Sequence, residues 1–158
     1  MEKLTWVLWQ ERELLETLLY RLEVEELVMS TGRTRWLGNA ARDVDEAAAA
    51  VREFEVLRAV AASAAAEAAG LESNAGLGEL IAVAAEPWRG ILTEHRDNFL
   101  SLTDEIARVA QTNRALIVSG LRATQDTLLG VDRSAATYTA AGAVDHGETR
   151  SAVLDRSL

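Results

Sequence analysis

Histidine is the side chain best suited to proton transfer near neutral pH, and this chain has two, His95 and His146. Neither belongs to a nucleophile motif, and the sequence has no glycine-rich phosphate loop. The absence of cysteine excludes thiolate catalysis, disulfides and cysteine-ligated metals. His95 falls on the apolar face of a helical pattern, where we expect a partly buried, hydrogen-bonded ring. His146 falls in a polar C-terminal segment, and we expect it to be solvated.

Two groups of carboxylates are the remaining candidates for acid–base or metal chemistry: Glu25 with Glu26, and Asp43 with Asp45 and Glu46. Carboxylate metal sites in helical bundles usually combine Glu-x-x-His motifs from facing helices, and the sequence contains no such motif. We therefore interpret both groups as solvated helix faces and partners of helix dipoles. The sequence predicts a protein that is not an enzyme and that holds no metal and no cofactor.

The composition favours long helices over strands. Of the 158 residues, 49% are hydrophobic and only 5% are aromatic, and the chain contains one proline. Proline interrupts the hydrogen-bond ladder of a helix and alanine is the best helix former, whereas a β-sandwich or barrel needs more β-branched and aromatic residues. The length is that of one domain. The sequence therefore predicts an all-α fold.

The formal net charge of −9 at pH 7 disfavours binding to nucleic acid or to anionic lipid headgroups. No segment approaches the run of about 20 apolar residues that spans a bilayer, so we expect no direct membrane insertion. The segment Met1–Trp6 lacks the basic and apolar regions of a signal peptide. These features favour a cytoplasmic bacterial protein.

Hydrophobic periodicity predicts four helices, at residues 2–29, 39–69, 77–84 and 87–129. The apolar face of the first consists of Leu4, Leu8, Leu15, Leu22 and Met29. The second is rich in alanine, and its expected seam is Ala50, Phe54, Leu57, Ala61, Ala64, Ala68 and Leu71. The last has an unbroken heptad seam of Leu92, His95, Phe99, Leu102, Ile106, Val109, Asn113, Leu116, Gly120, Ala123 and Thr127.

Together these patterns predict an elongated antiparallel three-helix bundle or coiled coil over residues 1–131, with a short extra helix. We expect all four tryptophans, Trp6, Trp9, Trp36 and Trp88, to take part in core packing. Residues 132–158 contain few large apolar groups, too few to offset the entropy of ordering, so we expect a flexible, disordered C-terminal tail.

The seam of the last helix becomes small or polar from Asn113 onward, and a second stripe of Ile117, Leu121, Thr124 and Leu128 replaces it. The stripe has two interpretations: it packs on the short helix, or it forms a groove for a helix of a partner protein. Asn113 also has two, as a functional polar group or as a buried asparagine that fixes helix register, and the second is favoured.

Two stretches of the sequence carry a family pattern. One runs from Leu8 to Glu16 (LWQERELLE) and continues through GRTRWL at residues 32–37 to Val44. The other runs from Leu100 to Gly120, with Ile106, Asn113-Arg114 and Leu116, and is followed by TYTAAG at residues 137–142. Together they resemble the FlgN-type flagellar export chaperones, in particular the actinobacterial branch with a tryptophan between the first two helices.

The resemblance implies a cytoplasmic chaperone that binds the hook-associated proteins FlgK and FlgL before their secretion and prevents premature assembly. Terminal helical segments of these clients would dock along the C-terminal helix. This assigns client binding to Asn113, Leu116, Ile117, Leu121, Thr124, Leu128 and Leu129. The chaperone would deliver its client to the export gate, a membrane protein. The family's tyrosine, matched by Tyr138, is implicated in docking there, although its usual acidic neighbour is Thr139 here.

Two alternatives remain open. Trp36-Leu37-Gly38 stands between two predicted helices, as in secreted helical hairpins of the WxG type. Those proteins carry a Tyr-x-x-x-Asp/Glu signal, whereas Tyr138 is followed four residues later by Gly142. The second alternative is a structural coiled-coil homodimer that forms through the last helix and binds no client.

Overall fold

The computed structural model describes the backbone of residues 1–137 and the side chains of residues 1–131. Its elements are α1 (Glu2–Ser30), the short 3-10 helix η1 (Thr34–Trp36), α2 (Leu37–Ala68), α3 (Leu77–Val83) and α4 (Trp88–Thr137). Every regular element in the described range is helical, which confirms the all-α prediction. The chain divides into two compact units, Met1–Leu116 and Ile117–Leu158, and α4 has residues in both.

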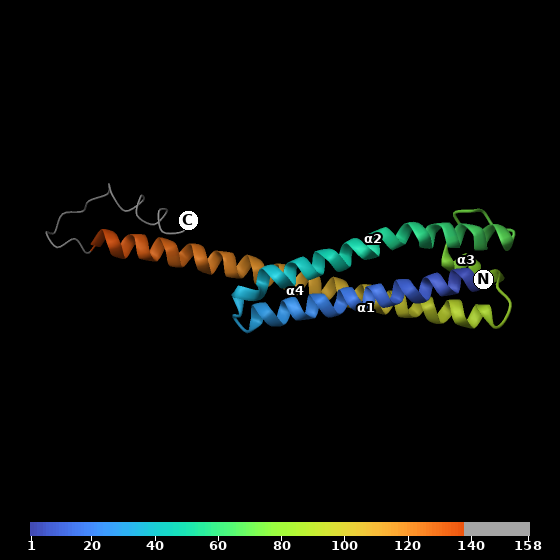
Figure 1. Cartoon of the computed structure of the whole chain (residues 1–158), viewed down its shortest axis with the longest axis horizontal. Coiled ribbons are helices and arrows are strands. Elements are labelled where there is room, and N and C mark those ends of the chain that lie inside the picture. Colours follow the sequence, from blue (N-terminus) through green and yellow to red (C-terminus); the bar gives the residue numbers. More distant parts are fainter. Residues whose placement is uncertain (138–158) are drawn as a thin grey trace. The chain divides into compact units, whose positions relative to one another are not determined.

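The first unit is a bundle in which the long helices α1, α2 and residues 88–116 of α4 lie side by side, each antiparallel to the one before it (Figure 1). Its core joins Leu4, Val7 and Leu8 of α1 to Ala61, Ala65 and Ala66 of α2, with Leu80, Ala84 and Leu92. The predicted seam of α4 is buried or half-buried at every position from Leu92 to Asn113. The heptad pattern of the last helix therefore identified its packed face.

Two glycines end the first two long helices. Gly32 has a φ of 68° and Gly70 a φ of 75°, in the left-handed region that glycine enters without steric cost. After α1, the Gly32 N–H donates to the Met29 carbonyl and the Arg33 N–H to the Val28 carbonyl, which is the Schellman pattern. The same pattern closes α2 at Gly70. These ends are fixed locally, and the sequence located both.

The buried face of α2 differs from the predicted one. Leu57, Ala64 and Ala68 of the predicted seam are exposed, and Ala65 and Ala66 from outside it are buried, whereas Ala61 is buried as predicted. The helix has alanine on all sides, so the sequence contains little contrast in size or polarity that could define a face. The predicted seam was partly wrong for this reason.

The prediction of core packing was also wrong for three of the four tryptophans. Trp6 is 60% exposed, Trp9 is 51% exposed and Trp36 is 47% exposed. Trp88 alone among them is packed against the main core cluster. Apolar surface on this scale usually lies inside or at an interface.

The last helix continues past its predicted end at Leu129 to Thr137, so it takes in the first residues of the segment for which we expected disorder. The expectation for residues 138–158, which include Tyr138 and His146, lies outside the described range. Within that range no helix is long and apolar enough to cross a membrane.

Candidate partner-docking surface

The second unit presents an apolar stripe on α4. Ile117, Leu121 and Leu128 are exposed, at 41%, 60% and 61%, and their spacing of four and seven residues places them on one helix face. Thr124 is exposed between them, and its hydroxyl donates to the Gly120 carbonyl at 2.9 Å, so its polar group is already satisfied within the helix. The stripe is therefore an exposed face of the second unit, as the partner-surface interpretation requires.

Val131, which we had not assigned to the site, extends this surface. It is 60% exposed and follows Leu128 by three residues, so it lies on the same face. We missed it because we had placed the end of the helix at Leu129. Below, "the α4 stripe" means Ile117, Leu121, Thr124, Leu128 and Val131. It is about 21 Å long at 1.5 Å per residue.

The other residues predicted for the site have different surroundings. Leu129 is exposed, but it points about 100° away from Leu128 around the helix. Leu116 is half-buried, and Asn113 is only 2% exposed. Asn113 and Leu116 belong to the first unit, whereas the stripe belongs to the second. Five exposed residues therefore share one face of α4 in the second unit, whereas Asn113 lies inside the bundle of the first.

Asn113 joins α4 to α1. Its Nδ2 donates to the backbone carbonyl of Leu22 at 2.9 Å and to Oε2 of Glu25 at 2.8 Å. This geometry supports the register interpretation of the asparagine, because a single buried amide with fixed partners penalises any sliding of one helix along the other.

Glu25 contradicts the prediction of a solvated carboxylate, since it is buried beside Asn113. The signal was present in the sequence: heptad spacing from Leu4 and Leu8 through Leu15 and Leu22 also includes positions 11 and 25. Both hold glutamate, and both are buried. Asp45 and Glu46 are exposed as expected, and Asp43 forms an ion pair with Arg21 at 3.2 Å.

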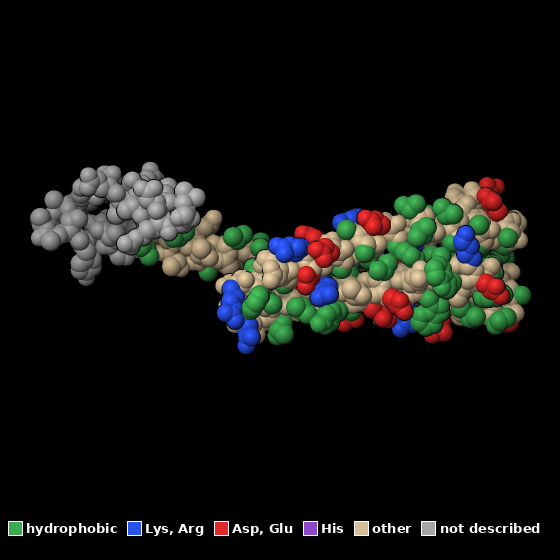
Figure 2. All heavy atoms as spheres, viewed as in Figure 1, with side chains coloured by type: hydrophobic (Ala, Val, Ile, Leu, Met, Phe, Trp, Pro, Cys, Tyr) green, Lys and Arg blue, Asp and Glu red, His purple; other side chains and the backbone are tan. Residues whose placement is uncertain are grey.

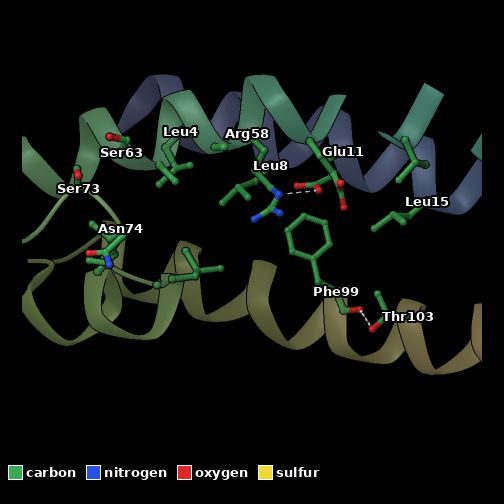
Figure 3. A pocket seen from close by; sticks show the side chains of 18 residues that line it. Leu4, Leu8, Glu11, Leu15, Arg58, Ser63, Ser73, Asn74, Phe99 and Thr103 are labelled. Atoms are coloured by element: carbon green, nitrogen blue, oxygen red, sulfur yellow. Dashed lines mark hydrogen bonds and ion pairs between the residues drawn. The ribbon is translucent and has the colours of Figure 1, made fainter. Parts of the chain in front are cut away.

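Glu11 forms the second buried polar contact, in a cavity of about 520 Å³ lined by all four α-helices and by residues 73–76 (Figure 3). Its Oε1 lies 2.9 Å from Nε of Arg58 on α2, while its Oε2 is buried without a hydrogen-bond partner. Burial raises the pKa of Glu11 above its usual value, and the positive charge of Arg58 opposes the rise.

His95 is buried between rings. Trp9 meets it edge-on with a centroid distance of 5.4 Å, and Phe99 stacks on it at 6.2 Å. Desolvation lowers the pKa of His95, which favours the neutral imidazole at physiological pH. The predicted burial is confirmed, but aromatic rings take the place of the hydrogen-bond partner. Among the described residues no group of three or more potential ligands could hold a metal ion.

The family model for the FlgN protein matches residues 1–146. The chain belongs to the FlgN family. The match includes α1, α2, α3, all of α4 and the segment that contains Tyr138. No curated protein and no solved structure gives a significant match.

Members of the FlgN family are cytoplasmic chaperones of flagellar protein export and are not enzymes, so this chain is a flagellar export chaperone. FlgN-family chaperones bind hook-associated proteins. An exposed apolar helix face is what a chaperone for helical segments needs, because such segments bind through apolar residues at heptad spacing. In this FlgN-family chain the α4 stripe has that spacing and exposure.

Proposed function

We propose that this FlgN-family chaperone binds the hook-associated proteins FlgK and FlgL through the second part of α4. The α4 stripe is the observation that carries the proposal, since it places four large or β-branched side chains and a threonine on one exposed face. Each leucine that a client buries fully contributes about 1.5–3 kcal/mol. Leu129 and Val118, both exposed at the side of the stripe, would widen the contact.

The client segments are terminal helices with apolar faces that remain unpaired until the filament is assembled. Covering such a face keeps the client from self-association and leaves it unfolded for transport. Asn113 acts indirectly in this proposal: its bonds to Leu22 and Glu25 hold the first part of α4 in register within the bundle.

The matching experiment is co-purification of full-length chaperone with FlgK and FlgL from its own organism. The variant Leu121→Asp/Leu128→Asp removes two apolar anchors and should weaken capture by about 100-fold or more. Helical content by circular dichroism should stay unchanged, because both side chains are exposed.

Arg122→Asp is the matched control. Like the double variant, which adds two negative charges, it lowers the net charge by two, because one positive charge is replaced by one negative charge. Position 122 is exposed on another side of the same helix. It should bind clients within about threefold of the natural chain. Equal capture by the double variant and the natural chain would remove the α4 stripe from the mechanism. Capture of neither client by the natural chain would remove these two proteins as its clients.

A further inference from the structure

The outward side of α1 carries a second heptad pattern, in which Trp9 also meets the buried ring of His95 on α4. Its spacing alternates four and three through Glu2, Trp6, Trp9, Glu13, Glu16, Tyr20, Glu23 and Leu27, and every one of these residues is exposed. We call this set the outer stripe of α1. The pattern on the opposite side, which includes Leu4, Leu8 and Leu15, is buried in the core. Heptad spacing of large side chains is the pattern by which helices pack on helices.

The composition of the outer stripe is unusual for a solvated face. The chain has eight Trp, Tyr and Phe residues, and three of them, Trp6, Trp9 and Tyr20, lie here with about half or more of their surface exposed. Tryptophan and tyrosine are the residues most enriched at the centres of protein interfaces. In Figure 2 hydrophobic and acidic side chains, with some basic ones between them, lie over the part of the surface that α1 occupies in Figure 1.

The charges of the outer stripe select the partner. Four of its eight positions are glutamate, and the described structure gives Glu2, Glu13 and Glu23 no ion-pair partner. Guanidinium groups already lie over two of its rings, with Arg12 at 5.3 Å from the Trp9 ring and Arg21 at 5.5 Å from the Tyr20 ring. These two rings thus already have a cation contact within the chain, and arginine is the side chain that combines stacking on a ring with binding to a carboxylate.

We propose that the outer stripe of α1 docks a basic amphipathic helix of a second protein, distinct from the client on α4. Arginines and lysines of that helix lie opposite the glutamates, and its apolar residues pack on Trp6, Trp9 and Leu27. A second copy of this chain fits poorly, because two outer stripes would bring glutamates against glutamates at heptad positions. The proposal does not depend on the client assignment, since all its residues belong to the first unit.

The test uses the full-length chaperone and two synthetic helical peptides, each about 21 residues long. Both have leucine at one heptad position, and they differ only in carrying lysine and arginine or glutamate at the flanking positions. Labelled-peptide anisotropy measures binding, and the part of the change in tryptophan emission that is absent in Trp6→Ala/Trp9→Ala reports on these two rings, since the chain also contains Trp36 and Trp88. The basic peptide should bind and the acidic one should not. Binding should weaken as salt rises from about 50 to 300 mM, because exposed charges are screened.

Trp6→Ala/Trp9→Ala should lower the affinity for the basic peptide by about tenfold or more. Val56→Ala/Val60→Ala is the matched control, since it removes two exposed apolar side chains of α2 and should leave binding unchanged. Glu13→Lys/Glu23→Lys reverses charge at two exposed positions and should shift preference towards the acidic peptide. Circular dichroism checks that each variant is folded.

Three results would overturn the proposal: no binding of the basic peptide, equal binding of both peptides, or tryptophan variants that bind like the natural chain. Self-association of the natural chain that disappears in Trp6→Ala/Trp9→Ala would also overturn it, in favour of a second copy as the occupant.

Discussion

Glu11 occupies a position at which a leucine would continue the apolar pattern of α1. One oxygen of its carboxylate lies 2.9 Å from Nε of Arg58, and the other is buried without a hydrogen-bond partner. The charged form of this side chain therefore loses favourable solvation when the bundle folds. The neighbouring carboxylate of Glu55 adds repulsion. The folded chain therefore favours the protonated form of this side chain more than the unfolded chain does.

This shift predicts a pH dependence. Because the pKa of Glu11 is raised on folding, its favourable contribution is complete below the unfolded pKa of 4.5 and is lost as the pH rises through the folded pKa. Glu11→Gln stays neutral throughout. Its free energy of unfolding, relative to the natural chain, should therefore be higher at about pH 7 than at about pH 4 in urea titrations.

Glu13→Gln is the control for this measurement, because Glu13 is exposed on the same helix. The difference in free energy of unfolding between Glu13→Gln and the natural chain should vary little over the same pH range. A stability difference for Glu11→Gln that falls as the pH rises would contradict the assignment, and would mean that the attraction to Arg58 outweighs the desolvation of the carboxylate.

At the scale of the helices, Asn113 and Glu25 form the polar contact between α4 and α1. The core cluster that joins the helices is apolar and would tolerate a shift by one heptad better than this pair would. Their hydrogen bonds at 2.8 and 2.9 Å have ordinary lengths for an amide donor and an oxygen acceptor. The pair therefore contributes to register as well as to stability.

Asn113→Ala should destabilise the chain by about 1–3 kcal/mol, because it leaves the buried Glu25 carboxylate without its donor. Asn98→Ala is the matched control. Asn98 lies on the same helix, is half-buried and makes no side-chain hydrogen bond, so its replacement should change stability by less than about 0.5 kcal/mol. Urea unfolding followed by circular dichroism measures both. Equal stability of the two variants would show that the Asn113 contact does not hold α4 to α1.

The sequence was sufficient for the elements whose signals are local. The predicted ends at residues 29 and 69 lie within one residue of the ends of α1 and α2, and the heptads predicted the packed face of α4 from Leu92 to Asn113. It was not sufficient for α2, where alanine on every side left Leu57 and the true core alanines indistinguishable by pattern. Trp6 and Trp9 were misplaced for another reason. We treated large aromatic residues as core residues, although a periodic set of them on the polar side of a helix indicates an interface.

For the candidate site, the sequence located the exposed stripe on α4 but not its limits. Ile117, Leu121, Thr124 and Leu128 follow from periodicity alone. Asn113 was grouped with them, although heptad spacing places it on the face that packs on α1. Whether an asparagine faces a partner protein or its own bundle depends on the neighbouring helix, and Glu25 and Leu22 supply that answer only once the fold is known.

At the scale of the whole molecule, the two proposed surfaces lie in different units of the chain. The α4 stripe is apolar and suits the helical segment of a client, whereas the outer stripe of α1 is acidic and aromatic and suits a basic helix. Different chemistry at the two proposed surfaces would let one chain select two different partners. The net charge of −9 adds long-range attraction for the basic partner.

The family resemblance implies delivery to the export gate, for which we propose a third contact at Tyr138, the residue that follows Thr137 of α4 in the sequence. A tyrosine combines a large apolar ring with a hydroxyl, which suits an interface that forms and dissociates in water. Tyr138→Ala should therefore leave capture of FlgK and FlgL within about threefold of the natural chain while lowering their secretion by about tenfold. Thr139→Ala, which changes the adjacent side chain, should affect neither.

Co-purification measures capture, and the amount of client in the culture medium measures export. Normal export with Tyr138→Ala would exclude this residue from docking, and loss of capture would place Tyr138 in the client surface instead.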